Sequence, residues 1–411
     1  MRTEIVDVKA RHIFDSRGVP TVSASVTLAD GSVGTASAPS GASTGQYEAH
    51  ELRDNKPAYH GKGVFQAIYN VNRDIADFIR GMDGENQRKI DEALICLDGS
   101  ENKGKIGANA ILPVSLAVAK ACAASHRLPL FRYIGGIQGG RMPLTMMNII
   151  NGGAHANNGL DIQEFMIVPQ NTSSMVENMN HANEIYHTLK LILREKGLST
   201  AVGDEGGFAP NIKEDREALD LIVEAIEKAG FKPGKDVTIA LDIAASEWYH
   251  KGEYILPKSQ KRMTCRQLID HLSSLTAEYP ITSIEDPLGD EDIIGFRTIT
   301  KELPHLQIVG DDLFVTNPKR IAEGIKEGCA NAVLIKPNQV GTLTETLDAI
   351  ALAKNNGYGV IISHRSGETE DTTIADLAVA TNCGQIKTGA PARGERTCKY
   401  NRLLEIEDMI S

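Results

Sequence analysis

The chain has 411 residues, a length that favours two domains over a single core. Its 41% hydrophobic and 24% charged residues are typical of a globular protein, and a net charge of −11 at pH 7 argues against nucleic acid as a partner and for a cytoplasmic protein. Its six cysteines form no C-x-x-C pair, which argues against a disulfide framework and against a zinc site.

The N-terminal third is predicted to be an α+β domain, because strand patterns at 3–15 and 20–29 precede helical patterns at 62–80, 85–97 and 107–125. The first residues show no signal peptide, and the apolar stretch at 110–119 is too short to span a bilayer, so we expect no membrane partner. Pro113 is expected to kink its helix. The glycine-rich segment 134–141 indicates a boundary, which divides the chain into an α+β domain over 1–137 and a larger domain over 138–411.

Three loops carry candidate functional residues. The segment A-P-S-G-A-S-T-G at 38–45 is either a plain surface loop or a mobile lid. Around the glycine- and asparagine-rich segment 151–166 stand His155, Gln163 and Glu164, although a lone histidine there is more often structural. In G-D-E-G-G, Glu205 is a candidate acid, although an acid that caps a helix would look similar.

The last 175 residues repeat one pattern, a short apolar run that ends in a charged or polar residue. The intervals between the later runs suit a strand, a loop and a covering helix, and helical patterns at 317–328 and 342–357 fill two of them. Repeated βα units with reactive residues at the strand ends describe a TIM-type (β/α)8 barrel and its active face. The residues at these ends are Asp242, Glu285, Asp311, Lys336, His364 with Arg365, and Lys387.

The first three of these strand ends are acids, Asp242, Glu285 and Asp311, and they should converge near the barrel axis. Three carboxylates in one place repel one another unless a cation joins them. Oxygen ligands without cysteine or histidine at ligand spacing favour Mg²⁺ or Mn²⁺ over zinc. The alternative, three unrelated surface acids, is harder to reconcile with three matching strand ends.

The remaining strand ends are basic. Beside a bound cation, Lys336 should have a lowered pKa and could act as a general base, with Glu205 as an acid on the opposite face. Arg365, Ser366 and Lys387 together suit a phosphate. The alternatives are a salt bridge between Lys336 and one of the acids, and basic residues that only balance the acidic charge.

The motifs together resemble the enolase family. The segments D-S-R-G-x-P-T, S-G-A-S-T-G, N-G-G-x-H-A, G-D-E-G-G, S-I-E-D-P, G-D-D-L, S-H-R-S-G-E-T-E-D and I-K-T-G-A-P-A-R occur in family order from about residue 4 to the C-terminus. The resemblance implies a barrel that opens ββαα before six βα units. Val19, Pro113 and Gly394 depart from the family pattern, and none of them belongs to the charged ring.

The resemblance also implies an activity, the reversible dehydration of 2-phosphoglycerate to phosphoenolpyruvate in glycolysis and gluconeogenesis, with two Mg²⁺ ions, for which Mn²⁺ can substitute. Lys336 would take the α-proton, the Mg²⁺ ions would stabilise the enediolate, and Glu205 would protonate the departing hydroxide. The first Mg²⁺ would bind Asp242, Glu285 and Asp311, and Ser40 would help to bind the second. The substrate site would be formed by His155, Gln163, Glu164, His364, Arg365, Ser366 and Lys387.

The family is usually dimeric and sometimes octameric, so a homo-oligomer is expected. Two other interpretations compete with a dehydratase of 2-phosphoglycerate. An acid-sugar dehydratase or racemase of the same superfamily would share the three acids but would lack S-H-R-S and I-K-T-G. An enolase retired to a binding role would be expected to have lost Glu205, Lys336 or a metal acid, and none of these is lost.

Overall fold

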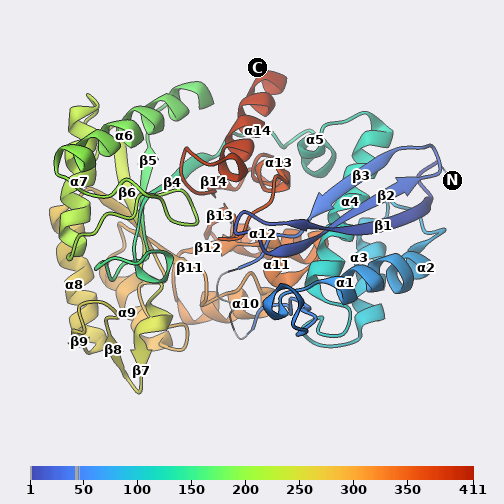
Figure 1. Cartoon of the computed structure of the whole chain (residues 1–411), viewed down its shortest axis with the longest axis horizontal. Helices are drawn as coiled ribbons and strands as arrows, with labels where there is room; N and C mark the ends of the chain where they lie inside the picture. The colour runs from blue at the N-terminus through green and yellow to red at the C-terminus, as the bar shows by residue number, and fades with distance from the viewer. Residues whose placement is uncertain (1, 42–44, 46) are drawn as a thin grey trace.

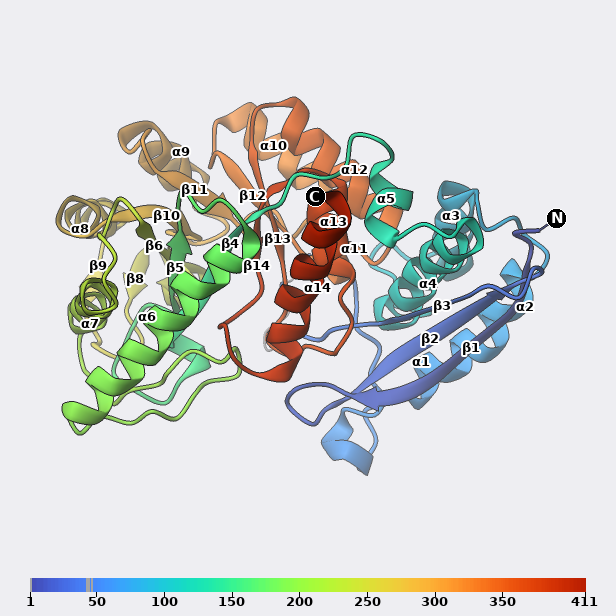
Figure 2. The ribbon, with the colours of Figure 1, turned by 90° about the horizontal axis from the view of Figure 1, so that it is seen from above.

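The computed structural model describes residues 2–41, 45 and 47–411. A small N-terminal domain lies against one side of a larger barrel, as Figures 1 and 2 show in blue and in green to red. The barrel carries the strand ends on which the predicted site depends.

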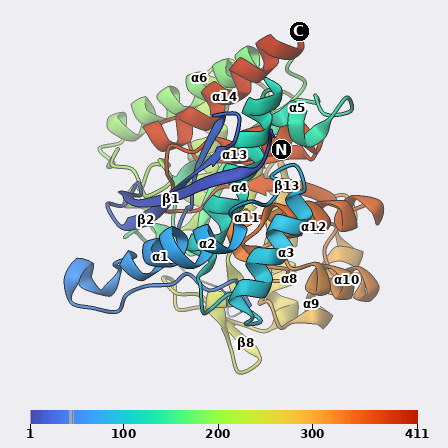
Figure 3. The same ribbon diagram turned by 90° about the vertical axis from the view of Figure 1, so that its right-hand side faces the viewer.

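The small domain is built from an antiparallel sheet with the strand order β1-β2-β3. Helices follow the sheet in sequence and lie alongside it (Figure 3). The predicted order of strands and then helices is therefore confirmed. The elements are β1 (Ile5–Phe14), β2 (Pro20–Leu28), β3 (Val33–Ser37), the short helix η1 (Ala58–Gly61), α1 (Phe65–Asn70), the π-turn η2 (Val71–Ile75), α2 (Ala76–Ile79), α3 (Gln87–Asp98) and α4 (Ala108–His126).

Helix α4 forms the centre of the small domain. It is continuous through Pro113, although a kink was expected there. By length and apolar composition, α4 is the one helix in residues 2–41, 45 and 47–411 that could cross a membrane, but 89% of its apolar window is buried inside the protein. A Cβ added at Gly34 of β3 would lie only 2.1 Å from the Ala117 carbonyl, so the sheet packs backbone-to-backbone against α4.

The larger domain is a closed barrel of eight strands in the order β10-β11-β12-β13-β14-β4-β5-β6. The strand pairs from β6 through β10 to β14 and β4 are parallel, while β5 is antiparallel to both of its neighbours. The strands are β4 (Leu144–Asn151), β5 (Glu164–Pro169), β6 (Val237–Asp242), β10 (Ile281–Glu285), β11 (Gln307–Gly310), β12 (Ala332–Ile335), β13 (Gly359–Ser363) and β14 (Gly384–Lys387).

Helices cover the outside of this barrel, and the order β4, β5, α6, α7 confirms the predicted ββαα opening. The helices are α5 (Leu130–Gly135), α6 (Met175–Glu195), α7 (Asp215–Lys228), α8 (Cys265–Glu278), α9 (Ile293–Glu302), α10 (Pro318–Glu327), α11 (Pro337–Val340), α12 (Leu343–Asn355), α13 (Thr373–Ala380) and α14 (Gly394–Ile410), with short turns η3 (Gly153–His155) and η4 (Ala245–Trp248). A small sheet that the sequence did not predict adds β7 (Tyr249–His250), β8 (Glu253–Ile255) and β9 (Arg262–Met263).

Local signals explain where these helices begin and end. Helix α10 starts at Pro318 after Asn317, whose side chain accepts a hydrogen bond from the Lys319 amide, and it ends at Gly328 in the left-handed conformation. Both ends match the prediction. Helix α12 begins after the capping Thr342 and its last residue is Asn355; the predicted stop, Gly357, follows the C-cap Asn356 in the left-handed conformation.

The small domain is held to the barrel by ion pairs and hydrogen bonds. Lys103 pairs with Glu345 at 2.9 Å, and Lys120 pairs with Asp371 at 2.8 Å. A backbone bridge joins Ser40 to Gly367, next to Ser366. The loop that begins at residue 38 therefore lies over the end of β13. Residues 42–44 of the predicted lid fall outside the described part of the chain.

Candidate active site

A pocket of about 600 Å³, counted with its open mouth, lies at the carboxyl ends of the barrel strands. This is the face on which the sequence placed the reactive residues. Most of the predicted site residues line it, and Glu285 and Ser40 do not. The lining residues are Glu48, His155, Gln163, Glu164, Glu205, Asp242, Ala244, Glu247, Asp286, Asp311, Asp312, Lys336, Ser363, His364, Arg365, Ser366 and Lys387.

Lys387 is the centre of the acidic side of the pocket. Its Nζ lies 3.0 Å from Asp242, 2.8 Å from Glu285 and 3.3 Å from Glu164, and the side chain is only 3% exposed. Burial would lower the pKa of Lys387, but the carboxylates around it raise the pKa well above its usual value. Lys387 is therefore a fixed positive charge. Its neighbour Glu285 has a pKa well above the usual value, because of burial and the nearby Asp242 carboxylate.

Lys336 forms an ion pair, which is the alternative that the sequence left open. At the end of β12 its ammonium pairs with Asp311, and the Lys336 backbone amide donates to Thr316 Oγ1 at 2.9 Å. Burial is the largest single influence and lowers the pKa of Lys336, but the carboxylates around it, Asp311 first and then Glu285, raise it, and the net shift is upward. The lowered pKa expected from the sequence requires a cation on Asp311, so it remains a prediction for the metal-bound protein.

Glu205 lies on the other side of the pocket, on the loop that follows α6. Asn148 of β4 donates to Glu205 Oε2 at 3.2 Å, and the rings of His155 and His364 lie 3.8 and 3.6 Å from its oxygens. Burial would raise the pKa of this carboxyl, but His364, His155 and Arg396 lower it well below its usual value. Glu205 is thus buried as a carboxylate among imidazoles.

Glu164 reaches the same rim because β5 runs in the opposite direction. An antiparallel strand presents its first residue where parallel strands present their last, and Glu164 pairs with Asp242 across the ladder. Its Oε2 is buried without a hydrogen-bond partner, and burial together with Glu205 raises its pKa well above normal. Gln163, just before it, donates to Asp242 at 3.4 Å.

Two groups of pocket side chains could hold a metal ion within residues 2–41, 45 and 47–411, since their ligand atoms lie within 4.8 Å of one another. One consists of His155, Glu164 and Glu205, and the other of Asp286, Asp311 and Asp312. Of the acids predicted as metal ligands, only Asp311 belongs to either group. Asp242 and Glu285 instead both pair with the Lys387 ammonium, so the positive charge between them belongs to this side chain. This oxygen-rich rim suits a hard cation such as Mg²⁺.

The remaining predicted residues lie on the small-domain side of the pocket. Arg365 binds Glu48 through two contacts, at 2.8 and 3.3 Å, and Ser366 follows it in the lining. Ser40 is buried beside the pocket rather than in it, with its hydroxyl donating to Glu51 at 3.0 Å and accepting from Arg53 at 3.2 Å.

Several pocket residues were missed by the sequence reasoning. Asp286 and Asp312 directly follow predicted acids, so the doubled acids in S-I-E-D-P and G-D-D-L were an available signal. The Asp286 carboxylate accepts from the backbone amides of Asp311 and Asp312 and so fixes that turn. Glu48 lies in a turn and Glu247 in the short helix η4, and neither was singled out by the sequence. Gln339, outside the pocket lining, donates to Asp311 at 3.2 Å.

Comparison with protein families agrees with this geometry. Residues 5–134 match the family model described as the enolase N-terminal domain, and residues 140–411 match the one described as the enolase C-terminal TIM barrel domain. Together the two matches cover nearly the whole chain. With its closed barrel and an acidic pocket that could bind a metal ion, the chain belongs to the enolase family and is a lyase of the enolase superfamily.

Proposed function

We propose that the protein reversibly dehydrates 2-phosphoglycerate to phosphoenolpyruvate in a Mg²⁺-dependent reaction. The observation that supports this most strongly is one pocket holding Lys336 and Glu205 on different sides, beside the cationic residues Arg365 and Lys387. Lys336 directly follows β12. The loop of Glu205 pairs with β4, which lies three strands away around the ring. An elimination in which the proton and the hydroxide leave from opposite faces of the substrate uses a base and an acid on separate sides of the pocket.

Recognition of the substrate falls to the S-H-R-S turn after β13. Arg365 and Ser366 offer a guanidinium and a hydroxyl to the phosphate, and an arginine fork suits phosphate oxygens. Arg365 is already oriented by Glu48 and by Asn338, which lies 3.2 Å from its Nη1. A superfamily enzyme that acts on acid sugars without phosphate would have no use for this turn, which favours 2-phosphoglycerate over such substrates.

Lys336 is proposed to remove the α-proton. The ion pair with Asp311 holds its ammonium charged, so Lys336 becomes a base only when Asp311 takes another cation as its partner. Asp242, Glu285 and Asp311 would hold that cation, Mg²⁺. When bound, Mg²⁺ would stabilise the negative charge that develops on the substrate carboxylate.

Glu205 is proposed to protonate the departing hydroxide, and for this it must first carry a proton. Its pKa is held low by the imidazoles and by Arg396. An anionic substrate beside Glu205 raises its pKa, because a second negative charge disfavours the carboxylate. His155, 3.7 Å from Glu164 and 3.8 Å from Glu205, lies where it can pass a proton between the two.

The proposal is tested by the absorbance of the conjugated double bond of phosphoenolpyruvate. Purified protein is incubated with 2-phosphoglycerate with and without Mg²⁺, and in parallel with an acid sugar that lacks phosphate. Product from 2-phosphoglycerate only, and only with Mg²⁺, supports the proposal. Turnover of the acid sugar instead would assign the chain to a dehydratase of different specificity, and no turnover of either would favour a binding protein.

Assembly and location are part of the same proposal. We propose a homo-oligomer, a dimer or an octamer, in the cytoplasm, without a membrane or nucleic-acid partner. Light scattering on the eluting protein measures its mass directly. A monomer at micromolar concentration would contradict the proposed assembly.

A further inference from the structure

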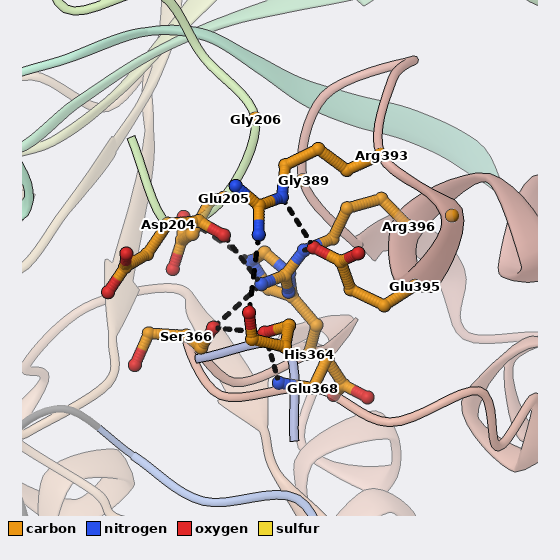
Figure 4. A network of polar contacts seen from close by, with 12 residues as sticks. Asp204, Glu205, Gly206, His364, Ser366, Glu368, Gly389, Arg393, Glu395 and Arg396 are labelled. Carbon is orange, nitrogen blue, oxygen red and sulfur yellow. Dashed lines mark hydrogen bonds and ion pairs between the residues drawn. The ribbon is translucent and has the colours of Figure 1, made fainter. Parts of the chain in front are cut away.

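Arg396, in the first turn of α14, has no exposed side-chain surface and belongs to none of the predicted site residues. Figure 4 shows its guanidinium between the loop of Glu205 and the turn of His364. A buried arginine is costly unless its donors are satisfied. The partners of its Nη1 and Nη2 belong to the two loops on either side of it, whereas Nε has no hydrogen-bond partner and lies 3.4 Å from Glu395 Oε1 of the same helix.

One of these partners is the imidazole of His364, whose Nδ1 lies 2.6 Å from Arg396 Nη1. A guanidinium has donors and no acceptor, and it is not deprotonated in proteins. Nδ1 of His364 must therefore present its lone pair, so the single proton of the neutral ring is on Nε2. An imidazolium would place a second N–H against the guanidinium.

The Nε2–H of His364 is buried without a hydrogen-bond partner and faces Glu205 Oε2 at 3.6 Å. A movement of about half an ångström would bring the pair within ordinary hydrogen-bond distance. His364 is thus oriented as a donor toward the carboxyl of Glu205.

The same guanidinium ties the two loops together through backbone carbonyls. Nη1 donates to the Arg365 carbonyl at 2.7 Å, and Nη2 donates to the carbonyls of Ser366 at 2.7 Å and Asp204 at 3.0 Å. Gly389 makes room for the side chain, since a Cβ at this position, where φ is +85°, would lie 2.7 Å from Arg396 Cδ.

We propose that Arg396 is a positioning residue that fixes His364 in its Nε2–H tautomer and so makes it a hydrogen-bond donor, not a base, toward Glu205. The proposal rests on the proposed function for the role of Glu205, but the tautomer itself is a property of the protein without substrate or metal. His364 then orients the Glu205 carboxyl and stabilises its charge once the proton has been given up.

Lys399 offers a matched control from the next turn of α14. It is equally buried, and its ammonium pairs with Glu368 at 2.9 Å and donates to the carbonyls of Thr369 and Glu395. Lys399→Met and Arg396→Met each remove one buried cation from the same helix. Arg396→Met alone removes the donor to His364.

The first test is ¹⁵N NMR of histidine-labelled wild-type protein without metal or substrate, with His364→Gln used to assign the signals. The expected result is a bare Nδ1 and a protonated Nε2 on His364. A proton on Nδ1, or a rapid mixture of tautomers, would overturn the proposal. The tautomer is read on the wild-type protein without substrate, so the result does not depend on the activity, and the variant serves only to assign the signal.

The second test compares Arg396→Met, Arg396→Lys and Lys399→Met in melting temperature, tautomer, kcat and KM for 2-phosphoglycerate. Arg396→Met should give mixed His364 tautomers and a kcat lower by about 10- to 100-fold, by analogy with residues that fix the tautomer of metal-bound histidines, with a much smaller change in KM. Arg396→Lys, which keeps a donor, should recover part of both. A loss of kcat in Lys399→Met as large as that in Arg396→Met, or an unchanged tautomer in Arg396→Met, would contradict the proposal.

Discussion

Replacing Lys387 by Met removes the ammonium that neutralises Asp242, Glu285 and Glu164, to which it lies within 3.3 Å. Removing one partner of a buried ion pair costs about 3–5 kcal/mol. For a domain of this size each kcal/mol lowers the melting temperature by about 2–4 °C, so a loss of about 6–20 °C is expected in EDTA.

Mg²⁺ should restore part of this loss, because the variant leaves carboxylates without their cation. At a concentration 100 times its Kd, a ligand that binds only the folded state contributes about 2.7 kcal/mol.

The loss in EDTA should also be larger at pH 8 than at pH 5. Burial raises the pKa of Glu285 and Glu164 above their values in the unfolded chain, so these groups lose folded-state stability as pH rises and they ionise.

The assay is thermal melting followed by circular dichroism, for wild type and Lys387→Met, in EDTA and in increasing MgCl₂. The reasoning predicts a larger rise with Mg²⁺ in the variant than in wild type. A variant that melts with wild type in EDTA, or equal rises in the two proteins, would refute it.

Three further predictions concern the rim and its support. Asp242→Asn should raise the Mg²⁺ concentration needed for half-maximal activity and lower the maximum, since an amide keeps the shape but loses the charge; unchanged values would remove Asp242 from the metal site. Ser40→Ala should lower turnover with an unchanged circular dichroism spectrum if Ser40 helps to bind a second Mg²⁺, and full turnover would leave it as a link between Glu51 and Arg53 only. Burial, and after it the Asp161 carboxylate, raises the pKa of Asp215 to about 7, so the stability of the folded state falls as pH rises from about 4 to 7. Asp215→Asn should therefore flatten the dependence of melting temperature on pH. A slope equal to that of wild type would contradict this assignment.

The barrel was predictable because its strands end at residues that a buried strand would otherwise avoid. Asp242, Glu285 and Lys387 are the last residues of β6, β10 and β14, and Asp311, Lys336 and His364 directly follow β11, β12 and β13. The signals that define strands and helices act over a few residues, so the apolar runs and the capping residues were enough to predict these elements. The family resemblance supplied the ββαα opening, while the reversed direction of β5 was not predicted.

The features that could not be predicted depend on contacts between segments that are far apart in the sequence. The pKa of Lys336 follows from its contact with Asp311, and the partner of Arg365 is Glu48, 317 residues away in the chain. Arg396 lies on an ordinary helix and becomes part of the site only because the fold brings α14 under two loops. No local pattern marks such a residue.

Hydrogen exchange at the α-carbon of 2-phosphoglycerate in D₂O, followed by NMR, tests the proposed division of labour most directly. Lys336→Ala should abolish both exchange and product, because no other group is proposed to take the proton. Glu205→Gln should lose product by about 10²–10⁴-fold and still show exchange, since the base remains. Exchange that survives in Lys336→Ala and disappears in Glu205→Gln would contradict the account.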